Sequence, residues 1–408
     1  MKKTLLLSVV ASAVVMAGGD IAPVEPAVEA PVVEETASNW DFNGQAVIYY
    51  ETNDRTSKYD LFDQGSSRAD AGLQLKAVND DVAYGIGAGV EVSALGTLAL
   101  EKDVVSGVMA NPSTGNLKGG WVSQAYVTYG MDNTSFKIGR QELPKALSPF
   151  AFSESWNVFK NTFDAALVVN TDIEDTTLVG AYVAGANNYT GMSTFGDIGA
   201  SNKGVYMLTA QNKSVDDLTL TGTYYYAQEF AAGEDANILW VDAQYTMDNY
   251  LFAAQGGTVM CDALADDSIA FGAKVAGDFD MFKASLAFSS TDENFAMVNL
   301  GTGVKTPLYT QMIANQTTIS QDADYVKVAA STELYDGNVG LAFGYAIANE
   351  DDTVGGKDNN PYELDLTYST KVFDESTTLF AGYVMQNADI DPKNNASNLV
   401  RVWGRYNF

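Results

Sequence analysis

The chain has 408 residues, with 23 Lys and Arg against 52 Asp and Glu, a formal net charge of −29, one cysteine and no histidine. So acidic a chain is a poor partner for nucleic acid, and one cysteine cannot form an intramolecular disulfide. The lack of histidine excludes a Ser-His-Asp site, a His-bearing zinc site and a histidine general base, and we expect no enzymatic activity.

The first 39 residues predict a signal for export followed by a short stub. Residues 1–17 begin with Lys2 and Lys3, continue with an apolar run and end in a cleavage-like site, which is typical of a secretory signal peptide. This run is shorter than the roughly 18 apolar residues that a membrane-spanning helix needs, as is every later one. Residues 18–39 are rich in Pro, Glu, Ala and Val and predict a disordered stub ahead of a folded domain at 40–408.

From residue 40 onward, the chain repeats a run of about ten alternating residues followed by a break, and the breaks are alternately short and long. This rhythm predicts an all-β fold, a transmembrane antiparallel β-barrel of 18 strands, with 16 as the alternative, whose short turns share one rim and whose long loops share the other. All nine prolines lie outside the predicted strand interiors, as a sheet without edges requires. The predicted strands are 40–51, 69–78, 82–94, 121–130, 134–139, 162–170, 176–184, 204–212, 218–228, 238–246, 250–257, 268–276, 281–289, 324–332, 339–348, 362–370, 377–386 and 399–408.

Within these strands, one set of alternate residues is apolar and is expected to face lipid. It includes Leu73, Leu75, Tyr84, Ile86, Val90, Phe271, Val275, Phe282, Leu286, Leu341, Phe343, Leu364, Leu366 and Tyr368. The opposite set carries charges that a dry interior would bury at prohibitive cost. A barrel of about 16 to 18 strands is wide enough for water. The predicted pore wall contains Lys76, Glu91, Lys137, Asp164, Asp242, Lys274, Lys283, Lys327, Glu363, Asp365, Arg401 and Arg405.

The third long loop, residues 140–161, combines charges of both signs with Phe150, Phe152, Trp156 and Phe159. So many aromatic side chains need a surface to pack on, which predicts a loop folded into the barrel. Its charged residues would then form the pore constriction; they are Arg140, Glu142, Lys145, Glu154 and Lys160. The excess of carboxylates lies in the outer loops, and charge at a pore mouth predicts a weak preference for cations.

The last strand, LVRVWGRYNF, has an apolar face with Val400, Val402, Tyr406 and Phe408 and a cationic face with Arg401 and Arg405. Together with the leader MKKTLLLSVVASAVVMAGG, the opening strand WDFNGQAVIYY and the segment GRQELPKALSPF, it resembles the porins of Gram-negative outer membranes. The resemblance is greatest to the Campylobacter-type major outer-membrane porins and related substrate-selective porins.

The resemblance implies a channel in the outer membrane for passive diffusion of ions and small hydrophilic solutes, with periplasmic turns and extracellular loops. It also implies a homotrimer, contact with outer-membrane lipid and lipopolysaccharide, and recognition of Tyr406 and Phe408 by the barrel assembly machinery. The alternative is a structural or adhesive surface barrel whose extracellular loops carry the function.

Acidic clusters occur at Asp262, Asp266 and Asp267, at residues 350–352, and at Asp389 with Asp391. Loop-bound Ca²⁺ would use oxygen ligands of this kind, but no cluster has a complete ligand set or EF-hand spacing. We therefore interpret them as solvated anionic loops and expect no cofactor or metal site. Cys261 is expected in a loop as a passive thiol.

Overall fold

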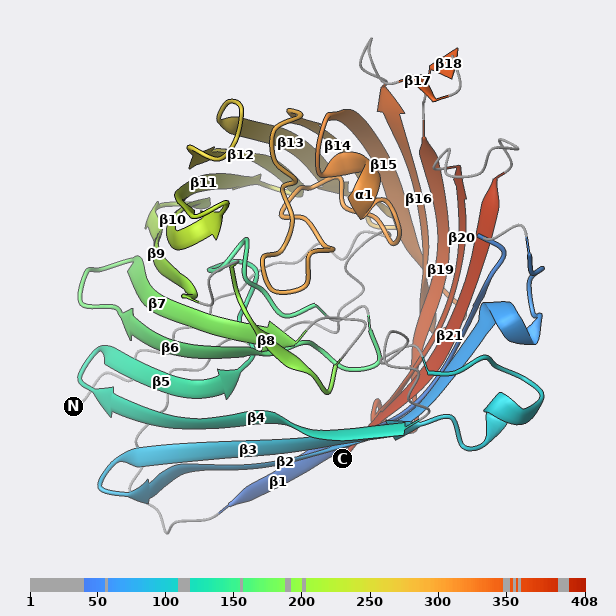
Figure 1. Ribbon diagram of the computed structural model, residues 1–408, viewed down its shortest axis with the longest axis horizontal. Coiled ribbons are helices and arrows are strands. Elements are labelled where there is room, and N and C mark those ends of the chain that lie inside the picture. The colour runs from blue at the N-terminus through green and yellow to red at the C-terminus, as the bar shows by residue number, and fades with distance from the viewer. Residues whose placement is uncertain are drawn as a thin grey trace.

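Period-two alternation builds strands that pair in chain order, each antiparallel to the next. The computed structural model describes residues 40–55, 58–108, 118–154, 157–187, 192–199, 203–347, 353–354, 357–358, 361–387 and 396–408. Its main sheet has 19 strands, of which three-residue β8 (Phe195–Asp197) is a short addition to β7, and the other eighteen close into a barrel when β1 pairs with β21 (Figure 1). The prediction of an eighteen-stranded antiparallel barrel is confirmed.

The barrel strands are β1 (Asp41–Asn53), β2 (Ser67–Ala83), β3 (Ile86–Gly96), β4 (Lys118–Met131), β5 (Thr134–Gln141), β6 (Phe163–Asn170), β7 (Thr176–Asn187), β9 (Val205–Val215), β10 (Leu218–Ala231), β11 (Glu234–Met247), β12 (Tyr250–Cys261), β13 (Ser268–Asp278), β14 (Lys283–Thr291), β15 (Ala323–Leu334), β16 (Gly337–Ile347), β19 (Tyr362–Val372), β20 (Thr377–Asn387) and β21 (Ser397–Asn407). Outside the barrel, β17 (Thr353–Val354) pairs with β18 (Lys357–Asp358), and α1 (Gln316–Ile319) is a single turn. Within the described residues, no helix is long and apolar enough to cross a membrane.

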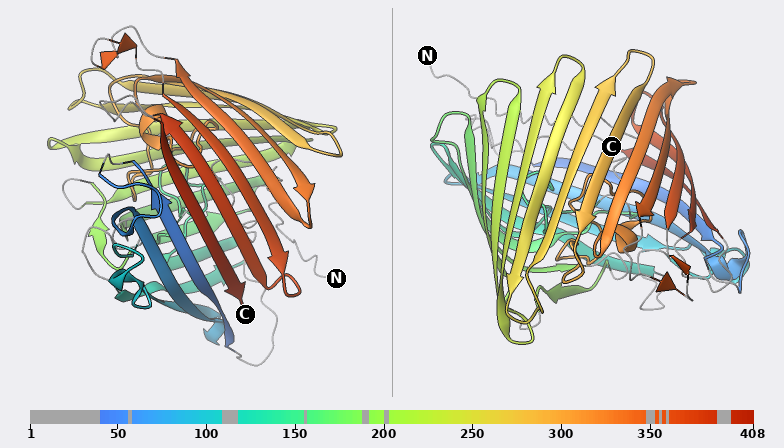
Figure 2. Two further views of the ribbon diagram at one scale, coloured as in Figure 1. Left: turned by 90° about the vertical axis from the view of Figure 1, so that its right-hand side faces the viewer. Right: turned by 90° about the horizontal axis from the view of Figure 1, so that it is seen from above.

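Eight turns of two to five residues connect strands at one rim, and the long segments lie at the other (Figure 2). Several details differ from the predictions, among them the position of Phe282, which lies in the turn before β14. The β2–β3 turn lies at Tyr84 and Gly85 rather than at residues 79–81, so Tyr84 is a turn residue and not part of the lipid-facing set. At the other rim, strands β10 and β11 extend until only Ala232 and Gly233 separate them, where a long loop was predicted.

The outer face of the barrel is apolar, with Leu73, Phe271 and Leu341 all exposed. The inner face has two characters. Along β7 to β11 it is also apolar and buried, as at Val183, Tyr225 and Trp240, because loops inside the barrel cover it. Water in the predicted aqueous interior therefore does not reach this part of the wall. Cys261 is likewise buried at the end of β12 rather than in a loop.

Candidate functional site

Loop 142–162 packs on two separate parts of the inner wall. Phe150 lies edge-on to Tyr225 of β10 and Trp240 of β11, with ring centroids 6.0 and 5.3 Å apart. Farther along the loop, Phe159 lies 6.2 Å from Trp121 of β4, and its neighbour Val158 is fully buried in the same cluster. Trp156 lies outside the described residues. Two of the aromatic side chains that suggested an inward loop, Phe150 and Phe159, thus pack on the wall.

These two contact areas lie on different parts of the barrel, one on β7 to β11 and the other on β1, β3 and β4. The first cluster includes Val179, Tyr225, Ile238 and Trp240 of β7 to β11, and the second includes residues of β1 and β3 such as Val47 and Leu95. Arg405 of β21 also donates to the Val158 carbonyl at 2.9 Å. Loop 142–162 therefore crosses the interior from one side of the barrel to the other.

A second inward loop, residues 292–322, was missing from the sequence interpretation. Figure 1 shows it in orange within the ring of strands. Its residues Met297, Leu308 and Met312 are buried in the cluster that holds Phe150. The sequence offered one signal for this loop: apolar residues are spread along the 31 residues between two strands. Such residues need a surface to pack on, as was argued for loop 142–162.

The two loops are joined by hydrogen bonds between their main chains and side chains. Leu300 N donates to Phe150 O at 2.7 Å, and Asn299 Nδ2 donates to Phe152 O at 2.7 Å. Glu154 accepts from Asn299 Nδ2 at 3.0 Å and from Thr302. Lys145 Nζ reaches the Thr306 carbonyl at 3.0 Å. Two of the predicted constriction residues, Lys145 and Glu154, thus tie the loops together.

Charged groups meet where loop 142–162 faces strands β3 to β5 and β21. Lys160 Nζ lies 2.9 Å from Glu142, whose side chain is 38 % exposed. Gln124 donates both to Glu142 at 3.4 Å and to Glu91 at 3.1 Å. Lys137 Nζ lies over the face of the Tyr126 ring, 3.9 Å from its centre. Together with inward-facing Lys76 and Arg405, these groups form what we call the basic wall, which has more cations than carboxylates.

A second polar area lies on β11 and β13. Tyr309 of loop 292–322 donates to Asp242, and Gln244 donates to the same carboxylate at 3.0 Å. Lys274 is on the same inward face of β13 and is partly exposed. Lys283 pairs with Asp278 at 3.4 Å near the short-turn rim.

Five predicted pore-wall residues face inward but are covered. Glu91 is 5 % exposed and accepts from Ser123 and Gln124. Arg401 pairs with Glu51 and is 2 % exposed. Lys327, Glu363 and Asp365 are 6 %, 1 % and 0 % exposed, because loop 292–322 lies over them. Solvent in the interior does not contact these groups, which corrects their assignment to an open pore wall.

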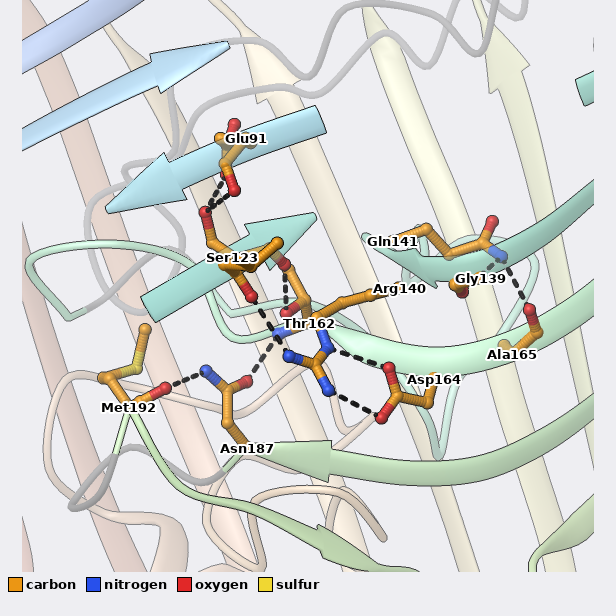
Figure 3. Close-up of polar contacts among 11 residues, drawn as sticks. Glu91, Ser123, Gly139, Arg140, Gln141, Thr162, Asp164, Ala165, Asn187 and Met192 are labelled. Atoms are coloured by element: carbon orange, nitrogen blue, oxygen red, sulfur yellow. Dashed lines mark hydrogen bonds and ion pairs between the residues drawn. The ribbon is translucent and has the colours of Figure 1, made fainter. Parts of the chain in front are cut away.

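Arg140 and Asp164 lie on the outer face, not in the interior. Arg140 Nε and Nη2 bind the Asp164 carboxylate at 2.8 and 2.9 Å (Figure 3). Arg140 is directly opposite Ala125, which is opposite the lipid-facing Val90, and opposed residues in antiparallel strands share a face. Asp164 also alternates with the buried inward residues Phe163 and Ala165.

The reason for this error is the apolar inner wall. Residues of β6 on the inward parity pack against the loop cluster, so apolar side chains occur on both faces and parity alone does not separate them. Arg140 was also assigned to a loop, whereas β5 continues to Gln141. The predicted roles of Arg140 in the constriction and Asp164 in the pore wall are therefore wrong.

At the seam where β21 pairs with β1, Tyr406 and Phe408 face outward and are 47 % and 50 % exposed. Phe408 exchanges two main-chain hydrogen bonds with Gly44 of β1, at 2.8 and 3.0 Å.

Asp262, Asp266 and Asp267 follow β12, while residues 350–352, Asp389 and Asp391 lie outside the described residues. In the described part of the chain, no three His, Cys, Asp or Glu side chains gather to hold a metal ion.

Neither a protein-family model nor a curated protein matches the chain. Solved structures do match. OccAB3 of Acinetobacter baumannii aligns with a TM-score of 0.74 and 13 % identity over 91 % of this chain and 99 % of that one. OccK8 (OprE) of Pseudomonas aeruginosa gives 0.71 and 12 % over 91 % and 98 %, and the P. aeruginosa outer membrane protein OpdK gives 0.71 and 12 % over 90 % and 99 %. At such low identity, the likeness establishes the barrel fold.

Proposed function

We propose that this chain is an outer-membrane porin, a water-filled channel for passive diffusion of ions and small hydrophilic solutes that is narrowed by loops 142–162 and 292–322. One observation carries the proposal: inside a closed barrel whose outer face is apolar, the basic wall retains partly exposed charges, such as the Glu142–Lys160 pair. Partly exposed charges inside the barrel require water, because an interior filled by packed apolar side chains would not accommodate them.

The proposed setting is the outer membrane of a Gram-negative bacterium, reached through a signal peptide at residues 1–17. OpdK, whose structure is similar, is an outer membrane protein. The resemblance in sequence motifs to Campylobacter-type porins supports the finer family assignment, a homotrimer, contact with lipopolysaccharide, and assembly through Tyr406 and Phe408. Chemical cross-linking of the protein in native membranes tests the trimer.

The channel is tested by single-channel conductance of the purified protein in planar bilayers. A porin gives discrete steps that scale with salt concentration, whereas a purely structural or adhesive barrel gives none. Swelling of proteoliposomes in sugars of increasing size then measures the size cut-off. OpdK has been solved with vanillate, so a small aromatic carboxylate is a suitable first charged solute.

A further inference from the structure

A groove lies in the outer face of the barrel where strands β11, β12 and β13 run side by side (Figure 1). Its floor consists of three alanines, Ala243, Ala254 and Ala273, which are directly opposite one another in the β11–β12 and β12–β13 registers. The groove has a volume of about 470 Å³, within the range of about 300 to 1,000 Å³ that is typical of small-molecule sites. The larger side chains that surround the alanines include Tyr245, Phe252, Val275, Leu286 and Phe288.

The groove opens toward the membrane and not toward the interior. Ala273 alternates with Phe271 and Val275, which are both exposed on the outer face. In a bilayer, the outer face contacts acyl chains, and a hollow left empty would lose the dispersion contacts of its walls. An acyl chain in the groove contacts protein along its sides as well as beneath it, so it should be retained longer than a chain on a flat part of the barrel.

Toward the short-turn rim, the groove ends at a pair of aromatic rings. Tyr250 and Gly277 form the next outward pair beyond Phe252 and Val275. The rings of Tyr250 and Phe279 meet edge to face with centroids 6.0 Å apart, and a Cβ atom on Gly277 would come within 2.8 Å of the Phe279 ring. Glycine at this position therefore lets Phe279 rest against β13. Aromatic residues at the rim of a membrane barrel lie at the level of the lipid headgroups.

The turns beside these rings are acidic and enclose a second hollow of about 870 Å³. It lies at the rim itself, so residues of both faces of the sheet line it, together with the turn residues Asp248, Asp278 and Asp280. Asp278 pairs with Lys283 at 3.4 Å, whereas in the described part of the chain Asp248 and Asp280 form no ion pair and are exposed. Two carboxylates beside aromatic rings attract an ammonium group and repel a headgroup with a net negative charge.

We propose that the groove and the acidic hollow beside it hold one glycerophospholipid with an ammonium headgroup, such as phosphatidylethanolamine. One acyl chain lies over Ala243, Ala254 and Ala273, and the ammonium group lies beside Asp248 and Asp280. This proposal rests on the membrane setting of the proposed function, in which the short turns are periplasmic. Lipid retention does not depend on conduction, so the two proposals can fail separately.

The test uses the full-length protein in phosphatidylglycerol vesicles that contain a trace of phosphatidylethanolamine with a photoreactive acyl chain. After irradiation, most of the label should lie on the strands that line the groove, residues 243–254 and 273–288. Ala254→Phe fills the groove and should lower this label roughly fivefold, because the chain loses its contacts with the walls. Ala243→Leu should act in the same direction. Ala381→Phe, at an outward alanine of β20, is the matched control and should leave the label unchanged.

A phosphatidylglycerol probe with the same photoreactive chain tests the headgroup. The phosphatidylethanolamine probe should label the groove about fivefold more strongly, and the double variant Asp248→Asn, Asp280→Asn should remove this excess. Equal labelling by the two probes in the parent would reject the ammonium headgroup.

Two results would overturn the lipid site as a whole. Label spread evenly around the barrel, unchanged by both groove-filling variants, would mean that only bulk lipid covers the groove. Disulfide formation between copies that carry Ala254→Cys in a Cys261→Ala background would assign the groove to a second copy of the chain. Groove-specific labelling in a protein that conducts no ions would support the lipid site and reject the porin function.

Discussion

Arg401 and Glu51 form a buried ion pair across the seam where the last strand meets the first. The two residues are directly opposite each other in the β1–β21 register, and Arg401 Nε donates to Glu51 Oε2 at 2.7 Å. Their side chains are 3 % and 9 % exposed, and Tyr49 OH donates to the same carboxylate at 3.3 Å. The seam therefore depends on a charge pair with little access to water.

Replacing one partner of this pair should destabilise the closed barrel. Glu51→Gln leaves the Arg401 guanidinium buried without its counter-charge, which costs about 3 kcal/mol of unfolding free energy. Urea unfolding in lipid vesicles, followed by the gel-mobility difference between folded and heated protein, measures it. The exposed pair Lys371–Glu375 provides the control, since Lys371→Gln should change stability by less than about 0.5 kcal/mol. Equal stabilities of the two variants would show that the seam does not need the pair.

The strands were predictable from the sequence wherever one face meets lipid and the other meets water. In β21, Val402 and Tyr406 face outward while Arg405 faces the basic wall, as the alternation indicates. The same argument failed at Asp164, because loop residues make the inner face of β6 apolar as well. The sequence of a strand reveals which side chains face inward only where the environments at its two faces differ.

Loop 142–162 was recognisable because its aromatic residues are concentrated in a short segment. Loop 292–322 was missed because its apolar residues are spread over 31 residues instead of being concentrated. Its contacts with the wall are a separate matter, because its main chain binds Glu363 and Asp365, about fifty residues away. No pattern within the loop encodes main-chain hydrogen bonds of this kind. The covered positions of Lys327, Glu363 and Asp365 could not be inferred for the same reason.

The outward ring of Phe408 lies over Gly44, where an added Cβ atom would collide with the Gln74 carbonyl and approach Phe408 Cζ to 2.9 Å. Deleting Phe408 should lower the yield of inserted, heat-modifiable barrel roughly tenfold, because the strand loses an aromatic anchor and two hydrogen bonds to Gly44. Asn407→Asp should insert like the parent, and Gly44→Ala should fall between them. A parental yield from the deletion variant would argue against a role for this residue in assembly.

Two arginines that were predicted to influence conduction should behave differently. Arg405 belongs to the basic wall, whereas Arg140 lies on the outer face in its pair with Asp164. Arg405→Gln should shift the permeability ratio toward cations by about twofold, since it removes a fixed positive charge within a Debye length of the ion path. Arg140→Gln should leave it unchanged. Reversal potentials in a KCl gradient at low salt measure both, and the opposite ranking would invalidate the facing assignment.

Shortening loop 142–162 should widen the channel. Removing residues 147–155 takes out Phe150 and Phe152, and with them the ring contacts to β10 and β11 and the main-chain bonds that hold loop 292–322. Conductance should rise by about twofold or more, and larger sugars should enter, because both loops would leave the path together. A shorter deletion of residues 98–102, an exposed segment at the same rim, controls for the effect of shortening a loop. The first deletion should change the size cut-off and the second should not. If both deletion variants insert and sieve like the parent, loop 142–162 does not set the width of the channel, even though it crosses the interior.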